Sequence, residues 1–164
     1  MNVLRALLLG AALSACSAPA FRHPPPPGTP VDGVMAGLGR PDAIYPEPDG
    51  GQVFEYRGQP MGQFQYMARI GPDGRFVSYE QVLTSENFAK VKIGQTDKDG
   101  ILRLFGRPAE VSRVGFHDYE VWSYRYKEAG VWNSMMHVHF DANGVVRQML
   151  NAPDPMYDDR FRRW

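Results

Sequence analysis

The alternation of apolar and polar residues predicts two similar blocks of β-strands along the chain. In each block an aromatic-rich run is followed by an alternating run, and a glycine-containing turn then leads into a third run. Alternation with a period of two residues is typical of strands that bury one face. The pattern predicts six strands, at residues 52–56, 63–70, 75–83, 119–126, 132–140 and 145–150.

A helix with a repeated sequence is expected before each block of strands. Residues 29–41 align without a gap onto residues 96–108 at an offset of 67, and six of the thirteen positions are identical. Both segments begin with a threonine suited to the helix N-cap and end in Gly-Arg-Pro, which favours a helix C-terminus. Helix rules do not explain the two arginines, Arg40 and Arg107. A short extra helix is expected at 84–90, before the second block only.

These elements predict an α+β fold of two tandem repeats, at residues 29–83 and 84–150. Each repeat is expected to be a helix plus three strands, with the helices packed on one face of antiparallel sheet. One helix on a three-stranded meander buries little apolar surface, so the repeats are expected to share a sheet or to pack together. The sequence leaves one continuous sheet and two separate sheets as open alternatives.

Residues 1–15 have the layout of a secretory signal peptide. Arg5 precedes an apolar run at 6–13, and small residues close the run before Cys16. This run is shorter than the roughly 20 residues needed to cross a bilayer. Leu-Ser-Ala-Cys, ending at Cys16, also resembles the bacterial lipobox, so we expect lipidation of Cys16 and attachment to a membrane outside the cytoplasm. The alternative is an ordinary signal peptide with a chance cysteine.

Residues 16–28 are expected to form a tether, because four consecutive prolines favour an extended polyproline II conformation. The net charge of the chain is close to zero and does not indicate a particular class of partner. The sequence has 18 basic and 18 acidic residues, and removal of residues 1–15 takes away Arg5, which leaves 17 basic residues against 18 acidic ones. No nucleic-acid partner is therefore expected. Because Cys16 is the only cysteine and is expected to carry lipid, neither a disulfide nor a thiolate metal site is expected within the chain.

The second repeat resembles the SmpA/OmlA domain, the family of the outer-membrane lipoprotein BamE. The residues that carry the resemblance are Asn-Phe-Ala-Lys-Val-Lys-Ile-Gly-Gln-Thr at 87–96, Phe-Gly-Arg-Pro at 105–108, Trp-Ser-Tyr at 122–124 and Phe-Asp-Ala-Asn-Gly-Val at 140–145. The resemblance implies a non-catalytic lipoprotein on the periplasmic face of the outer membrane. Its implied function is to support envelope assembly or integrity through protein–protein contacts, and outer-membrane assembly components are the partners that the resemblance implies. The chain departs from the family in carrying two copies and in lacking a Gln-Gly-Asn stretch before the domain.

The tandem arrangement also resembles the β-lactamase inhibitor protein, whose two repeats form a concave sheet that binds an enzyme. This likeness gives an alternative function, a tethered inhibitor or regulator of a periplasmic enzyme. The two functions differ in the partner rather than in the fold.

A mixed polar and aromatic sheet face is the predicted partner-binding site. Alternation in the strand at 132–140 directs Met135, His137 and His139 away from the core. The matching positions of the first repeat supply Met67 and Arg69, and the neighbouring strand at 119–126 supplies Tyr119 and Arg125. The alternative is an ordinary solvated sheet face, and a register shift of one residue would exchange the two faces. The predicted site residues are Met67, Arg69, Tyr119, Arg125, Met135, His137 and His139.

No metal site, cofactor or catalytic site is predicted. His137 and His139 could present two imidazoles to one ion, but a zinc site wants at least three protein ligands, and nothing fixes a third one nearby. The sequence has no Gly-x-Ser-x-Gly elbow, no phosphate-binding loop and no His-Glu-x-x-His motif. Residues 151–164 are expected to form a tail that is either frayed or a short recognition segment.

Overall fold

The computed structural model describes residues 23–115 and 118–157. Within these residues no helix combines the length and the apolar character needed to cross a membrane. The predicted signal peptide, the lipidation site Cys16 and the last residues of the predicted tail lie outside the described residues.

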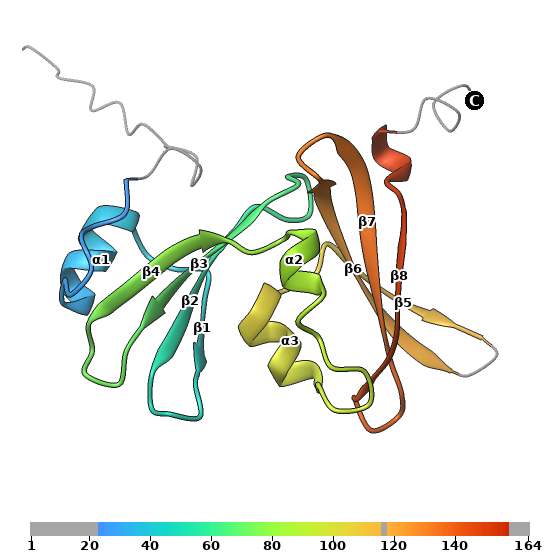
Figure 1. Ribbon diagram of the computed structural model, residues 1–164, viewed down its shortest axis with the longest axis horizontal. Coiled ribbons are helices and arrows are strands. Elements are labelled where there is room, and N and C mark those ends of the chain that lie inside the picture. Colours follow the sequence, from blue (N-terminus) through green and yellow to red (C-terminus); the bar gives the residue numbers. More distant parts are fainter. Residues whose placement is uncertain (1–22, 116–117, 158–164) are drawn as a thin grey trace, which may run out of the picture.

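The chain forms two four-stranded antiparallel sheets, each a simple meander with its strands in sequence order. In the described residues, three α-helices and one 3₁₀-helix accompany them, and Figure 1 shows the arrangement of the sheets and α-helices. The first sheet contains β1 (Ala43–Pro46), β2 (Gln52–Arg57), β3 (Gln65–Ile70) and β4 (Phe76–Gln81). The second contains β5 (Glu110–Val114), β6 (Tyr119–Glu128), β7 (Trp132–Phe140) and β8 (Val146–Pro153). The helices are α1 (Val31–Leu38), α2 (Ser85–Phe88), α3 (Lys98–Phe105) and η2 (Pro155–Tyr157).

The elements are stacked in four layers, with α1 first, then the first sheet, then α2 and α3, and then the second sheet (Figure 1). The first sheet is buried on both faces because its apolar residues are not confined to alternate positions. Phe54 and Ala68 belong to the cluster that contains α1 residues, whereas Val53 and Met67 belong to the cluster around α3. The predicted arrangement with all helices on one face of the sheet is therefore wrong, because α2 and α3 lie between two sheets.

The predicted count of three strands per repeat is also wrong, because each unit has a fourth strand that the pattern missed. β1 has only four residues and ends at Pro46, so it is too short to show an alternation. β5 is exposed at all five positions and has no buried face to produce one. The fold is mostly β, with two four-stranded sheets and short helices, rather than a pair of helix-plus-three-strand repeats.

The internal repeat is visible in equivalent contacts of the two units. α1 and α3 are separated by the offset of 67 residues seen in the sequence. A tyrosine of the second strand in each sheet donates a hydrogen bond to the carbonyl oxygen of the glycine that ends the helix. These bonds join Tyr56 to Gly39 at 3.1 Å and Tyr124 to Gly106 at 2.9 Å. The helix starts differ from the prediction, because α1 has no side-chain cap and Asp97, rather than a threonine, caps α3.

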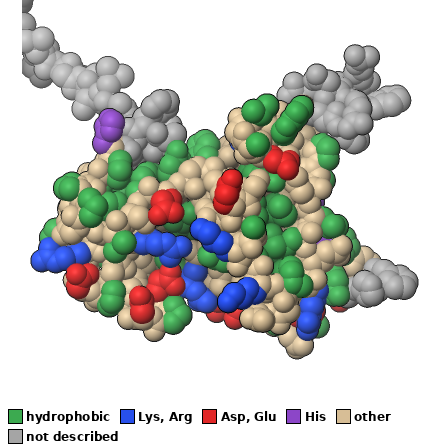
Figure 2. Space-filling model, viewed as in Figure 1, with side chains coloured by type: hydrophobic (Ala, Val, Ile, Leu, Met, Phe, Trp, Pro, Cys, Tyr) green, Lys and Arg blue, Asp and Glu red, His purple; other side chains and the backbone are tan. Residues whose placement is uncertain are grey.

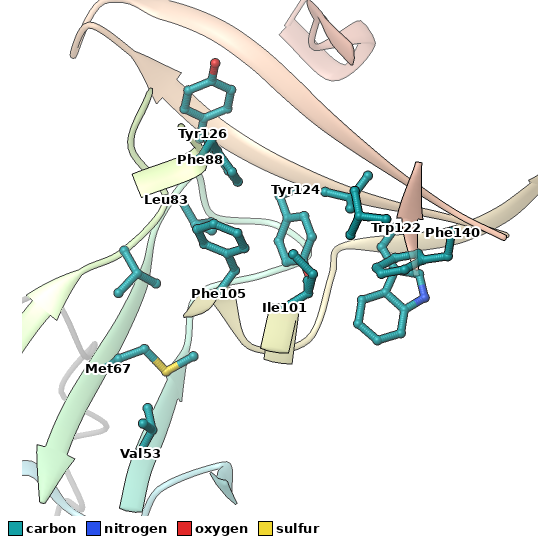
Figure 3. Close-up of a cluster of buried hydrophobic side chains, with 13 residues drawn as sticks. Val53, Met67, Leu83, Phe88, Ile101, Phe105, Trp122, Tyr124, Tyr126 and Phe140 are labelled. Carbon is teal, nitrogen blue, oxygen red and sulfur yellow. The ribbon is translucent and has the colours of Figure 1, made fainter. Parts of the chain in front are cut away.

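The main core lies between the two sheets and is filled by aromatic side chains (Figure 3). Phe105, at the end of α3, is fully buried, and its ring lies 4.7 Å from the Phe88 ring and 5.9 Å from the Tyr124 ring. Met67 of the first sheet belongs to the same cluster. Because this core takes residues from both sheets, the two units are expected to unfold together.

Replacing Phe105 with alanine tests this shared core. The variant Phe105→Ala is expected to lose about 3–5 kcal/mol of unfolding free energy, since it removes a fully buried ring and leaves a cavity. Urea unfolding should still show one transition. Val77→Ala, at a side chain that is 55% exposed, is the control and should change stability by less than about 0.5 kcal/mol. Two separate transitions in the wild-type protein would contradict the shared core.

Candidate functional site

A buried polar cluster joins the first sheet to the end of α3. Glu55 of β2 and Gln65 of β3 are diagonal neighbours on the same face of the first sheet, and both are fully buried. The Gln65 amide nitrogen donates to the carbonyl oxygens of Phe105, at 2.6 Å, and Arg107, at 3.3 Å. It also lies 3.2 Å from Oε1 of Glu55. These carbonyl groups end a helix and have no partner within it, so a side chain from the other unit satisfies them.

Glu55 completes this cluster from the opposite side. Its Oε2 accepts a hydrogen bond from the Tyr45 hydroxyl and one from the backbone amide of Arg107 at 3.3 Å. Burial raises the pKa of the Glu55 carboxyl, and these hydrogen bonds and the Arg107 guanidinium only partly oppose that effect. The pKa of Tyr45 is raised as well, first by burial and then by Glu55. The carboxyl group is thus held in a site that favours its protonated form.

Gly106 allows the close approach of helix and sheet. Its φ of 72° lies in the left-handed region, and an added Cβ would come within 2.8 Å of both the Glu55 carboxyl carbon and the Met67 terminal methyl. A side chain at Gly106 would therefore strain the backbone and displace the cluster.

A second contact between the units is made by the loop that connects β2 and β3. The side chain of Gln59 accepts from the Arg125 amide at 3.3 Å and donates to the Arg125 carbonyl at 2.8 Å. Arg125 lies beyond the last residue of β6 that pairs with β5, which is Ser123. The Gln59 amide therefore takes the place of a strand at this free stretch of β6.

Next to these contacts lies an open groove, which we call the junction groove, of about 460 Å³. Its apolar part includes Leu102 of α3, Val111 of β5 and Trp122 of β6, and two arginines, Arg57 and Arg107, lie in its wall. The complete lining consists of Arg57, Leu102, Arg107, Pro108, Ala109, Glu110, Val111 and Trp122. The groove combines apolar surface with positive charge, which is typical of a site for a ligand with both characters.

The two guanidinium groups of the groove bond to backbone carbonyl oxygens. Arg57 Nη2 donates to Pro108 at 2.9 Å, and Arg107 Nη2 donates to Asp42 at 3.0 Å. Within the described part of the chain neither arginine forms an ion pair with a carboxylate, and Nε of Arg57 has no hydrogen-bond partner. Carbonyl oxygens hold both cations in place, and both guanidinium groups also act electrostatically on the buried Glu55 carboxyl.

Charges elsewhere on the surface are mixed in sign. Figure 2 shows Lys and Arg side chains interspersed with Asp and Glu side chains across the middle and lower part of one face. Ion pairs such as Arg69 with Glu47 at 2.7 Å and Lys98 with Glu120 at 2.8 Å neutralise several of them. Arg57 and Arg107 of the junction groove bond to carbonyl oxygens instead, and they therefore differ from these ion-paired surface cations.

The structure separates the predicted site residues into two groups. Met67 and Arg69 lie on the side of the first sheet that faces α3. Met67 is only 1% exposed, so the prediction that it lies on an open face is wrong, because α3 covers that part of β3. Arg69 is half-exposed and pairs with Glu47.

The remaining predicted residues share the face of the second sheet that points away from α3. Register pairs Val121 with His139, Ser123 with His137 and Arg125 with Met135. Ser123 Oγ and His137 Nδ1 are 2.8 Å apart, and the Tyr119 ring meets the His139 ring edge-on at 6.4 Å. Burial lowers the pKa of both histidines, which favours neutral imidazoles. Met135 and His139 are buried, so little of their surface is open to a partner.

Arg125, the last of the predicted residues, pairs with the buried Asp154 instead of pointing into solvent. Asp154 follows β8, and its amide donates to the Asn133 carbonyl at 2.9 Å. The predicted tail therefore begins later than residue 151, because 151–153 belong to β8 and residue 154 is fixed by this ion pair.

In the part of the chain that the structure describes, no group of three or more His, Cys, Asp and Glu side chains is arranged to hold a metal ion.

Sequence reasoning missed the residues of the buried cluster and the junction groove. Glu55 lies inside β2, Gln65 is the first residue of β3, and Arg57 is the last residue of β2, so no sequence motif connects them. Arg107 could have been noticed from the sequence, because it recurs in the repeat and helix capping does not explain its recurrence. Its partner position, Arg40, lines a different surface depression beside α1.

Comparisons with known proteins do not place the chain in a family. No family model matches it, and no curated protein matches it. Among solved structures, it is similar to the DUF4309 family protein YjgB from Bacillus subtilis subsp. subtilis str. 168. The TM-score is 0.33 and the identity 13%, over 75% of this chain and 77% of that one.

The resemblance to the SmpA/OmlA domain, together with the likeness to the β-lactamase inhibitor protein, is wrong as an assignment. No family model supports it, and the chain forms two four-stranded sheets with short helices instead of tandem helix-plus-three-strand units. The quoted motifs mark a helix end, an aromatic strand and a turn, which many sequences share.

Substitution of Glu55 tests the buried carboxyl. A pKa raised in the folded state means that the folded protein holds the proton more tightly than the unfolded chain. The stability gained from this proton is complete when the pH is below 4.5, the ordinary pKa of a glutamate. It is lost as the pH rises through the raised pKa of the folded state. Between those limits, wild type should lose up to about 1.4 kcal/mol per pH unit relative to Glu55→Gln. Urea unfolding from pH 4 to 8 measures it, and parallel curves for the two proteins would contradict it.

Removal of Asp154 tests the ion pair that fixes the end of β8. The variant Asp154→Ala leaves Arg125 as a buried, uncompensated charge, so we expect a loss of about 3–5 kcal/mol. Arg113→Ala breaks a comparable pair with Asp118 in which both side chains are well exposed, and it should cost less than about 1 kcal/mol. Thermal or urea unfolding compares the two variants, and equal losses would show that burial of the pair is unimportant.

Proposed function

We propose that this protein is a lipid-anchored, non-enzymatic component of the bacterial cell envelope that acts by binding another protein. The observation that carries the proposal is β5, an edge strand exposed on both faces that lies directly beside the junction groove. Edge strands present unpaired backbone donors and acceptors, and proteins usually shield them unless they are used for pairing.

Exposed apolar side chains on β5 support a protein partner. Val111 is 58% exposed and Val114 is 40% exposed. Apolar residues of this size on an exposed strand next to a partly apolar groove are typical of interaction surfaces. The groove is open to solvent, which suits a protein segment.

The proposed location follows from the N-terminal sequence. Lipidation at Cys16 after removal of residues 1–15 would anchor the chain, and residues 16–28 would hold the folded part away from the lipid surface. We place the protein on the periplasmic face of the outer membrane, where it would support envelope assembly or integrity. A tethered inhibitor or regulator of a periplasmic enzyme is the second possibility, and the identity of the partner separates the two.

Site-directed photo-crosslinking in living cells tests the function. A photoreactive amino acid is placed at Val111 on β5, at His137 on the opposite face of the second sheet, or at Val77 on the first sheet. We expect a defined crosslinked protein from Val111, confirmed by a reciprocal crosslink from the partner, and loss of that product when Cys16→Ala removes the anchor.

Identification by mass spectrometry then decides between the two roles. Capture of a membrane-assembly or envelope-structure protein would support the first role, and capture of one soluble enzyme would support the second. Absence of a product from all three positions in cells that contain normal amounts of the protein would contradict a protein-binding function.

A further inference from the structure

We propose that β5 binds an extended peptide as an additional antiparallel strand, with the free carboxyl terminus of that peptide between Arg57 and Arg107. This inference rests on the proposed protein-binding function and specifies the partner as a protein with an exposed, extended C-terminal segment. It follows from the edge of the sheet, the adjoining groove and the position of the two cations.

β5 is the edge strand best suited to accept another strand. Each of the other three edges carries a feature that opposes pairing. β1 has four residues and contains Pro46, and β4 is paired to its neighbour through a register shift. β8 has a register shift and ends at Pro153. In contrast, β5 pairs regularly with β6 over five residues and contains no proline.

The junction groove can receive side chains from a strand added to β5. Val111 and Trp122 are directly paired, so both project to the same face of the sheet, toward α3. Leu102 of α3 lies on the other side of the groove. An added strand would direct every second side chain toward this face. An apolar side chain near the peptide end would therefore contact Leu102, Val111 and Trp122.

The direction of β5 determines which end of the peptide meets the arginines. β5 runs from Glu110 to Val114, and Arg107 and Pro108 precede it. The carboxyl terminus of an antiparallel strand would lie at the Glu110 end, where Arg57 and Arg107 are placed without ion-pair partners among the described residues. Charge-assisted hydrogen bonds to a carboxylate are favourable there, whereas a parallel strand would bring its positive amino terminus.

The one carboxylate on this part of β5 points the other way. Glu110 is paired with Ser123, whose hydroxyl contacts His137, so the three side chains share the opposite face of the sheet. The Glu110 charge also acts on the pKa of His137. Glu110 is part of the groove lining, but its side chain lies on the face opposite the place offered to the peptide carboxylate.

Peptide selection on the purified full chain in detergent tests the proposal. The probes are a random library of eight-residue peptides with free carboxyl termini and the same library with amidated termini. We expect enrichment from the first library only, and the best peptide should bind at least about tenfold more weakly after amidation. Hydrogen exchange should slow in residues 109–115 when the peptide is bound, because amides at the free edge become bonded.

Matched variants locate the site. Val111→Asp should weaken binding of the selected peptide at least about tenfold, while Val77→Asp, at an equally exposed valine of another edge strand, should leave it unchanged. Arg57→Gln and Arg107→Gln should each weaken binding of the free-acid peptide and hardly change binding of the amidated peptide. Arg75→Gln should change binding of neither peptide. Unfolding curves confirm that each variant is folded.

Three results would overturn the proposal: no peptide enriched from either library, equal binding of free acid and amide, or a selected peptide that is insensitive to Val111→Asp. Each is distinguishable from failure of the proposed function. If crosslinks form in cells from His137 while β5 binds no peptide, protein binding stands and only the β5 mode is wrong.

Discussion

The packing of the C-terminal end of α3 against the first sheet is the contact on which the rest of the structure depends. The last carbonyl groups of this helix need hydrogen-bond donors, and Gln65 of the other unit supplies one from a fully buried position. Glu55 accepts a hydrogen bond from the backbone amide of Arg107 at the same place, and Phe105 packs in the core beside it. Loss of this contact would leave buried polar groups unpaired on both sides, which is costly. The two sheets are therefore joined through specific bonds as well as through apolar burial.

The same contact positions the proposed binding surface. The chain leaves α3 through Gly106 and Arg107, passes Pro108 and enters β5 within a few residues. Because the end of α3 is fixed on the first sheet, the start of β5, the arginine from β2 and the arginine after the helix are brought to one groove. Neither repeat contains this groove alone, since Arg57 belongs to the first unit and Val111 to the second. Tandem duplication thus provides a surface that a single unit lacks.

The sequence predicted the regular parts of this fold and missed its connections. The long strands at 119–126 and 132–140 and the helix ends at Gly39 and Gly106 follow from alternation and glycine geometry, which act locally. β5 could not be predicted by alternation because neither of its faces is buried. Met67 was assigned to an exposed face because alternation indicates two faces but not that a second layer covers the outer one. Glu55 and Gln65 were missed for a similar reason, since their partners at the end of α3 lie 40 or more residues away.

Native-state hydrogen exchange in increasing urea tests the central claim most directly, because it reports the opening of each sheet separately. If the α3 contact makes one cooperative unit, the most protected amides of β3 and β7 should exchange with the same free energy and the same dependence on urea. Exchange of β3 amides through an opening of lower free energy, while β7 stays protected, would show that the sheets fold independently. The junction between them would then be a docking of two separate units rather than a shared core.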